Sequence, residues 1–149
     1  MAPETAAGFQ LHPRLAQDCV ELARLPLCRL LLMNERRYPW LILVPQRPGV
    51  TEIFHLPEAE QQQLLRESSS LARPLMAEFA ADKLNIAAIG NLVPQLHLHH
   101  VLRYCDDPAW PGPVWGRFTP EPYAASELPQ MQGRLRRVLS SLECAWTAG

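Results

Sequence analysis

The sequence lacks a long hydrophobic run. A helix that crosses a membrane needs about 20 predominantly apolar residues, and the longest apolar stretch here, PWLILVP at 39–45, is short and bounded by prolines. The first ten residues, MAPETAAGFQ, show neither the basic nor the apolar segment of a secretory signal. We therefore expect a cytoplasmic protein with no membrane partner.

An excess of basic charge is also missing. Lys and Arg together number 14, and Asp and Glu number 15, which gives a net charge of −1. The basic residues are scattered, whereas a surface that binds nucleic acid through its phosphates needs them clustered. This pattern argues against a nucleic-acid partner, although a small anionic ligand would need only one local site.

The four cysteines lie far apart, and no CxxC pair occurs. The spacing argues against a zinc ribbon or a dithiol redox site, and we expect reduced thiols. Proline, by contrast, is abundant, with 15 residues. Because proline interrupts helices and sheets, it should break the chain into short elements.

Apolar runs and one long amphipathic segment set the expected architecture. Residues 29–33 (RLLLM) and 40–44 (WLILV) carry continuous rather than alternating apolar runs and should form an antiparallel hairpin with both faces covered. Apolar spacing predicts a main helix over 57–81, kinked or split at Pro74. The other expected elements are strands at 9–11, 84–89 and 93–104, and helices at 14–23 and 131–142. This order predicts an α+β fold with a mostly antiparallel sheet.

Three of the five histidines fall within QLHLHHVLR, at 95–103. Alternate side chains of a strand share a face, so Gln95, His97 and His99 should lie together, with His100 on the other side. Three interpretations remain open: hydrogen-bonded core histidines, a zinc site, or phosphate chemistry with one imidazole as nucleophile and another as donor. A zinc site would need a third ligand, for which the candidates are His12, His55, Asp106 and Asp107.

Residues 95–101 resemble the histidine triad (HIT) motif, His-φ-His-φ-His-φ-φ, in which φ is apolar. The resemblance covers about 29–103. WLILVP at 40–45 is similar to the family's strand that ends in proline, and Leu56-Pro57 to the start of its helix. Asn85 lies close to the position of an active-site asparagine, and the tail DDPAWPGPVWG resembles a bacterial branch of the family.

The resemblance implies a HIT-like fold: an antiparallel sheet of about five strands with one long helix and a C-terminal helix, usually in a homodimer. It implies a nucleotide hydrolase or nucleotidyl transferase that acts at the α-phosphate through a covalent nucleotidyl-histidine, without a metal or other cofactor. His97 matches the nucleophile and His99 the third triad position, as donor to the phosphate. His100 is out of register.

Two residues depart from the family's pattern. Gln95 stands at the first triad position, where it can hydrogen-bond and so orient His97 but cannot become cationic. Trp40 stands where better-known relatives often have a supporting histidine. These departures favour one alternative, a nucleotide-binding module with little turnover. A second alternative is a zinc-dependent hydrolase that uses His97 and His99.

Three asparagines are candidate substrate-binding residues. Asn34 would contact a ribose or stabilise a turn, and Asn85 would support the ligand or bond to the backbone. Asn91 would donate to the phosphate or cap its turn.

The chain is expected to divide into a HIT-like domain at 1–105 and a tail at 106–149. The tail is rich in Pro and Trp, ends in a helix, and should pack on the same domain or on a dimer partner. Trp110 and Trp115 should fold back on the body, with stacking on a base as the alternative. Arg103 is expected to be a solvated charge.

Overall fold

A six-stranded antiparallel sheet forms the centre of the protein. The computed structural model describes residues 7–148, so residues 1–6, part of the stretch in which a secretory signal was sought, lie outside the described residues. The sheet has the order β4-β5-β3-β2-β1-β6. Its strands are β1 (Cys19–Arg24), β2 (Cys28–Met33), β3 (Trp40–Pro45), β4 (Lys83–Ala87), β5 (Leu98–Arg103) and β6 (Ala145–Trp146). The predicted α+β class is confirmed, and the short β6 takes the sheet beyond the five strands expected.

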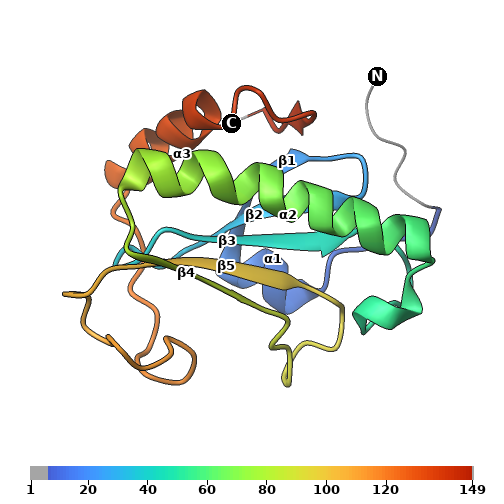
Figure 1. The fold of residues 1–149 in the computed structure, drawn as a ribbon, viewed down its shortest axis with the longest axis horizontal. Helices are drawn as coiled ribbons and strands as arrows, with labels where there is room; N and C mark the ends of the chain where they lie inside the picture. The colour runs from blue at the N-terminus through green and yellow to red at the C-terminus, as the bar shows by residue number, and fades with distance from the viewer. Residues whose placement is uncertain (1–6, 149) are drawn as a thin grey trace.

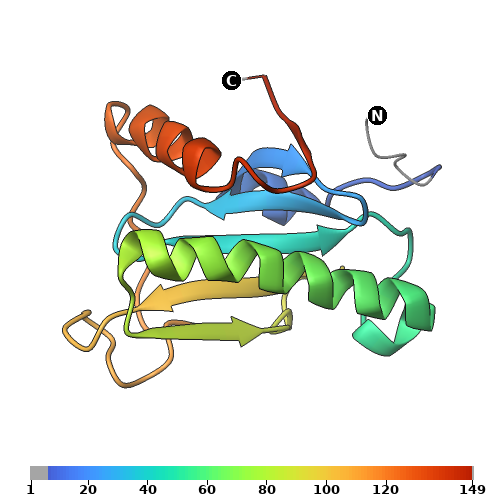
Figure 2. The same cartoon turned by 45° about the horizontal axis from the view of Figure 1, so that its top comes forward.

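Within the described residues, three α-helices and one short 3-10 helix accompany the sheet. They are α1 (Pro13–Asp18), η1 (Ile53–His55), α2 (Glu58–Phe79) and α3 (Glu127–Val138). The helix α2 lies across one face of the sheet, and α1 lies behind the sheet on the other (Figure 1). Turning the molecule shows α3 above the β1–β2 side of the sheet (Figure 2). Within residues 7–148, no helix combines the length and the apolar character that crossing a membrane requires.

The continuous apolar strands are buried on both faces, as the sequence predicted. In β3, Leu41 and Leu43 belong to the core beneath α2 and α3. Trp40 and Ile42 belong to a second core on the opposite face. The hairpin of β2 and β3 is antiparallel, with Leu31 opposite Ile42. The second core holds the histidines that are of functional interest.

Several expected elements were wrong in part. Residues 9–11 are not a strand, and the helix expected at 14–23 ends at Asp18, where β1 begins. The strand expected at 93–104 begins only at Leu98, because 88–97 form a loop that contains Pro94. The helix α2 continues through Pro74 without being split. The composition of β1, CVELAR, includes a single β-branched residue and does not distinguish this strand from a continuation of α1.

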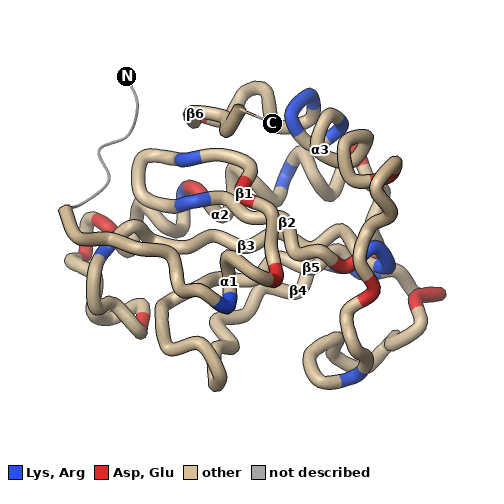
Figure 3. The backbone as a smooth tube through the Cα atoms, turned by 180° about the vertical axis from the view of Figure 1, so that it is seen from behind, with Lys and Arg blue, Asp and Glu red and all other residues tan. Residues whose placement is uncertain are grey.

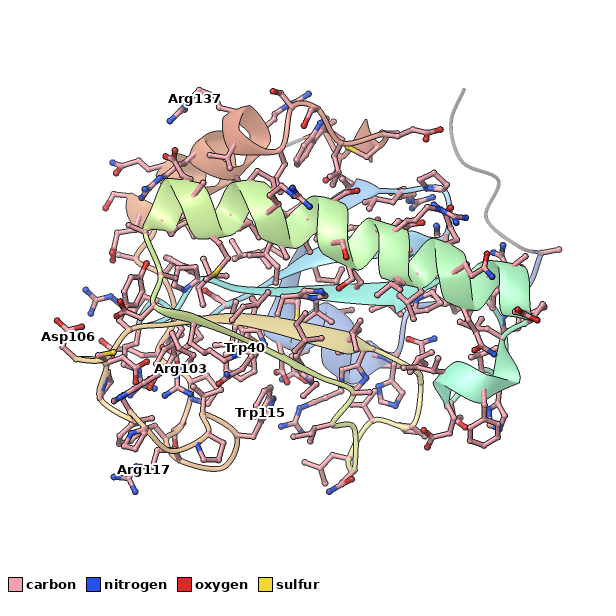
Figure 4. All side chains as sticks on the ribbon, in the orientation of Figure 1. Trp40, Arg103, Asp106, Trp115, Arg117 and Arg137 are labelled. Atoms are coloured by element: carbon pink, nitrogen blue, oxygen red, sulfur yellow. The ribbon has the colours of Figure 1, made fainter. Side chains whose placement is uncertain are left out.

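The Arg103 side chain is buried, not solvated, and it anchors the tail. It is 1% exposed and donates to both carboxylate oxygens of Asp107, at 2.7 and 3.0 Å. A third donor reaches Oδ1 of Asn85 at 2.9 Å. Figure 4 shows Arg103 beside the loop that carries Trp115. A buried guanidinium needs such partners. Because Asp107 is one of them, its ion pair with Arg103 holds the proline-rich segment against the sheet.

His100 faces α2, on the opposite side of the sheet from His99. Its Nδ1 lies 3.1 Å from the carbonyl oxygen of Leu98, which can only accept, so Nδ1 carries the proton. Its Nε2 lies 2.7 Å from the hydroxyl of Ser68 and therefore accepts from it. Burial lowers the pKa of His100 to about 4. A neutral, fully bonded imidazole thus joins α2 to β5.

Replacing Ser68 with Ala should destabilise the fold, because Nε2 of His100 would lose its donor inside the core. Leaving a buried polar atom unpaired costs about 1–3 kcal/mol. We expect a loss of that size in the free energy of unfolding, measured by urea denaturation. Ser69→Ala, at the exposed neighbouring position, is the matched control. Equal stability of the two variants would contradict this role for the Ser68 hydroxyl.

Candidate active site

A pocket of about 350 Å³ opens on the face of the sheet opposite α2. His97 and His99 both line it, together with residues from α1, β2, β3, the 88–97 loop and the tail. Apolar side chains predominate, among them Leu15, Met33, Ile42, Leu92 and Val93. An apolar pocket with a few convergent polar groups is typical of a site for a small molecule.

His97 lies immediately before β5 and is 5% exposed. Its Nδ1 is 2.7 Å from the backbone carbonyl oxygen of Gln95. Because a carbonyl only accepts, Nδ1 carries the proton and Nε2 keeps its lone pair in the neutral ring. Burial lowers the pKa of His97 below its ordinary value, with the backbone bond to Gln95 acting in the other direction. The ring is therefore neutral at neutral pH.

His99 has the opposite tautomer. The indole Nε1 of Trp40 lies 3.0 Å from Nδ1 of His99 and can only donate. Nδ1 therefore accepts, and Nε2 carries the proton that it donates to the carbonyl of Ile89 at 2.9 Å. Burial lowers the pKa of His99 to about 4. The rings of His97 and His99 meet edge to face with their centroids 4.8 Å apart.

The side chain of Gln95 ties the N-terminal segment to the 88–97 loop. Its Oε1 accepts from the backbone N–H of His12 at 2.9 Å, and its Nε2 donates to the carbonyl of Gln10 at 2.9 Å. The backbone carbonyl of Gln95, and not its amide group, contacts the His97 ring.

The three candidate asparagines lie in different surroundings. Oδ1 of Asn34 accepts from the backbone N–H of Tyr123 at 2.9 Å. Oδ1 of Asn85 accepts from Arg103. Asn34 thus contacts the tail directly, whereas Asn85 supports Arg103 of β5, which in turn binds Asp107 of the tail. Asn91 lines the pocket beside His97 and His99.

Trp115 and Ile89 complete the site, and sequence reasoning gave neither a defined place there. The ring of Trp115 contacts the His99 ring, with centroids 5.4 Å apart, and the Trp40 ring, with centroids 6.0 Å apart. Figure 4 shows Trp40 and Trp115 close together below the sheet. The expected folding-back of the tail was the available signal for Trp115, whereas Ile89 acts through its backbone and leaves no signal in the sequence.

Charged groups are few in this pocket. Arg14 and Asp18 line its edge and form an ion pair of 2.8 Å along α1. Elsewhere on this side, acidic and basic positions are interspersed along the backbone (Figure 3). Among the described residues, no group of three or more His, Cys, Asp or Glu side chains is arranged to hold a metal ion. The third ligand required by the zinc interpretation is therefore missing from residues 7–148.

Comparisons with known proteins agree with this geometry. Residues 14–106 match the HIT domain family. The chain is similar to the solved structure of a histidine triad protein from Marinobacter aquaeolei VT8, with 51% identity, coverage of 90% of this chain and 98% of that chain, and a TM-score of 0.87. A histidine triad protein from Bradyrhizobium japonicum is 46% identical, with coverage of 88% and 98% and a TM-score of 0.84.

A more distant structure shares the fold alone. It is a hypothetical histidine triad nucleotide-binding protein from Sulfolobus tokodaii strain7, 13% identical, covering 77% of this chain and 79% of that chain, with a TM-score of 0.58. No curated protein matches the chain. The family match covers more than half of the chain, and the bacterial relatives match nearly all of it. The chain therefore belongs to the histidine triad (HIT) family.

Proposed function

We propose that the protein is a nucleotide hydrolase or nucleotidyl transferase that works through a covalent intermediate on His97. The Nε2 lone pair of His97 attacks the α-phosphorus, an N–P bond forms, and the bond to the leaving group breaks. The leaving group keeps the electron pair and takes a proton from water. Water or another hydroxyl acceptor then attacks phosphorus and loses its proton, and the N–P electron pair returns to His97. No metal or other cofactor takes part.

The opposite protonation of two adjacent imidazoles carries this proposal. His97 keeps a lone pair on Nε2, while His99 carries a proton on Nε2. A nucleophile thus lies beside a donor that can stabilise negative charge on a phosphate oxygen. That oxygen would replace the carbonyl of Ile89 as acceptor, so His99 would donate without changing its protonation.

Gly90 supports the assignment of His97 as the nucleophile. A Cβ at this position would lie 2.6 Å from Cε1 of His97 and 2.6 Å from the carbonyl oxygen of Val93. The backbone of the loop therefore lies directly against the imidazole, at a distance that only glycine allows. Such close packing holds the ring in one orientation before substrate arrives, which is what a positioned nucleophile requires.

The remaining candidates are assigned as follows. Asn91 is the substrate-binding side chain at the pocket, while Asn34 acts through the tail that it binds and Asn85 acts through Arg103. Gln95 at the first triad position is a mark of the bacterial branch, and its carbonyl orients the nucleophile.

The substrate is a nucleotide or nucleoside phosphate derivative, as membership of the HIT family suggests. All four cysteines are free thiols, which fits a cytoplasmic location.

Turnover of an adenosine phosphoramidate tests the proposal. His97→Ala should lower kcat/KM on the order of a thousandfold or more, because the nucleophile is removed. His55→Ala, which alters an exposed histidine in η1, should leave turnover unchanged. In the wild type, kcat/KM should fall as pH drops through the pKa of His97, which lies below the ordinary value of about 6.5. The fall occurs because protonation occupies the attacking lone pair.

Tight binding of AMP without release of any leaving group would favour the binding module over the enzyme. Activity that requires added zinc would favour the zinc-dependent hydrolase. Equal turnover by His97→Ala and the wild type would contradict a nucleophilic role for His97.

We also propose that the protein is a homodimer in which the β4 edges of two copies pair. The strand β4 ends the sheet formed by residues 7–148, so within those residues one side of its backbone has no neighbouring strand. Ile86 and Ile89, on or just after this strand, are 47% and 44% exposed. Leu92, in the following loop, is 81% exposed. Pairing with a second copy would bury these apolar side chains and provide hydrogen-bond partners for the backbone N–H and C=O groups of β4.

Light scattering on the purified chain should give twice the monomer mass. Ile86→Glu should shift the protein toward the monomer, because it places a charge at the paired edge. Phe54→Glu, at a position 75% exposed in η1, is the matched control and should leave the mass unchanged. A monomeric wild type would overturn the dimer without affecting the proposal for His97.

A further inference from the structure

We propose that Trp40 is a positioning residue whose indole N–H fixes the tautomer of His99, so that the neutral His99 ring donates from Nε2 toward the site. The use of that donor in catalysis rests on the proposed function. The tautomer itself is a property of the free protein and can be measured without substrate.

The assignment follows from which atoms can donate. The indole nitrogen of Trp40 has a proton and no lone pair to offer, so the 3.0 Å contact defines Nδ1 of His99 as the acceptor. The carbonyl of Ile89 has no proton, so the 2.9 Å contact defines Nε2 of His99 as the donor. The two contacts agree on one neutral tautomer. Reversing it would set two donors against each other at Trp40 and two acceptors at Ile89.

The position of the indole is itself constrained. Trp40 is the first residue of β3, is 7% exposed, and lies opposite Val101 of β5. Its ring meets His99 at a centroid distance of 5.7 Å and an interplanar angle of 62°. Trp115 packs against the same ring from the tail, nearly perpendicular to it at 81°. The donor is therefore held by strand pairing on one side and by the tail on the other.

This arrangement makes His99 a hydrogen-bond donor in its neutral form, whereas a cationic histidine would donate only while it is protonated on both nitrogens. A charged imidazolium would donate from both nitrogens, but it would lose that ability as pH rises through its pKa. The neutral ring fixed by Trp40 donates from Nε2 at any pH above its low pKa. The titratable neighbours that act on His99 are His97 and His100, and both are buried with lowered pKa values. The pair of functional imidazoles therefore stays uncharged together.

Long-range ¹H–¹⁵N NMR spectra of the histidine rings, recorded on the full chain, test this directly. The wild type should show His99 with a protonated Nε2 and an unprotonated Nδ1, unchanged from neutral pH down to about pH 5, well below the ordinary histidine pKa. Trp40→Phe keeps an aromatic ring but removes the donor. It should abolish the single tautomer, giving averaged ring nitrogens, and should move the titration of His99 toward the ordinary value.

Trp115→Phe is the matched control, because Trp115 also packs against the His99 ring but is not its hydrogen-bond donor. It should leave the tautomer unchanged. An Nδ1-protonated His99 in the wild type would overturn the proposal, with no need for a folded variant. Equal effects of Trp40→Phe and Trp115→Phe would also overturn it, since packing alone would then account for both. A correct tautomer in a protein without turnover would refute the proposed function and leave the role of Trp40 intact.

Discussion

Keeping an imidazole buried and neutral requires hydrogen-bond partners of the right kind for its nitrogens. The centre of this sheet provides them to both nitrogens of His99 and His100 and to Nδ1 of His97. Leaving one such atom unpaired costs about 1–3 kcal/mol. His97 gives its Nδ1 proton to a carbonyl, and His100 gives one to a carbonyl while accepting from Ser68. His99 is bonded in the opposite sense by Trp40 and Ile89. These partners set the chemistry that each ring can perform.

The tail is part of the site because the buried charge of Arg103 holds it there. Arg103 leaves the end of β5 and is bonded to Asp107 and Asn85. A second anchor of the tail is the backbone N–H of Glu121, which donates to the carboxylate of Glu35 at 3.1 Å. Between these anchors, the proline-rich loop places Trp115 against the His99 ring. The segment that looks least regular in the sequence thus forms one wall of the pocket.

Much of the fold follows from patterns that depend on neighbouring residues. The apolar runs at 29–33 and 40–44 gave the hairpin, and alternation in the histidine segment correctly separated His99 from His100. What escaped prediction depends on how loops are placed and on partners in other strands. Arg103 looks like a surface charge until Asp107 and Asn85 meet it, and Trp40 looks like an apolar core residue until its N–H meets an imidazole 59 positions away. Periodicity carries no information about such long-range pairs.

The covalent intermediate on His97 is the central claim, and intact-protein mass spectrometry tests it most directly. The protein would be mixed briefly with an adenosine phosphoramidate and quenched without acid, since a phosphorus–nitrogen bond to histidine is labile in acid. We expect a mass increase of one adenylyl group in the wild type and none in His97→Ala. Consumption of substrate by the wild type with no adduct, or an adduct that persists in His97→Ala, would contradict it.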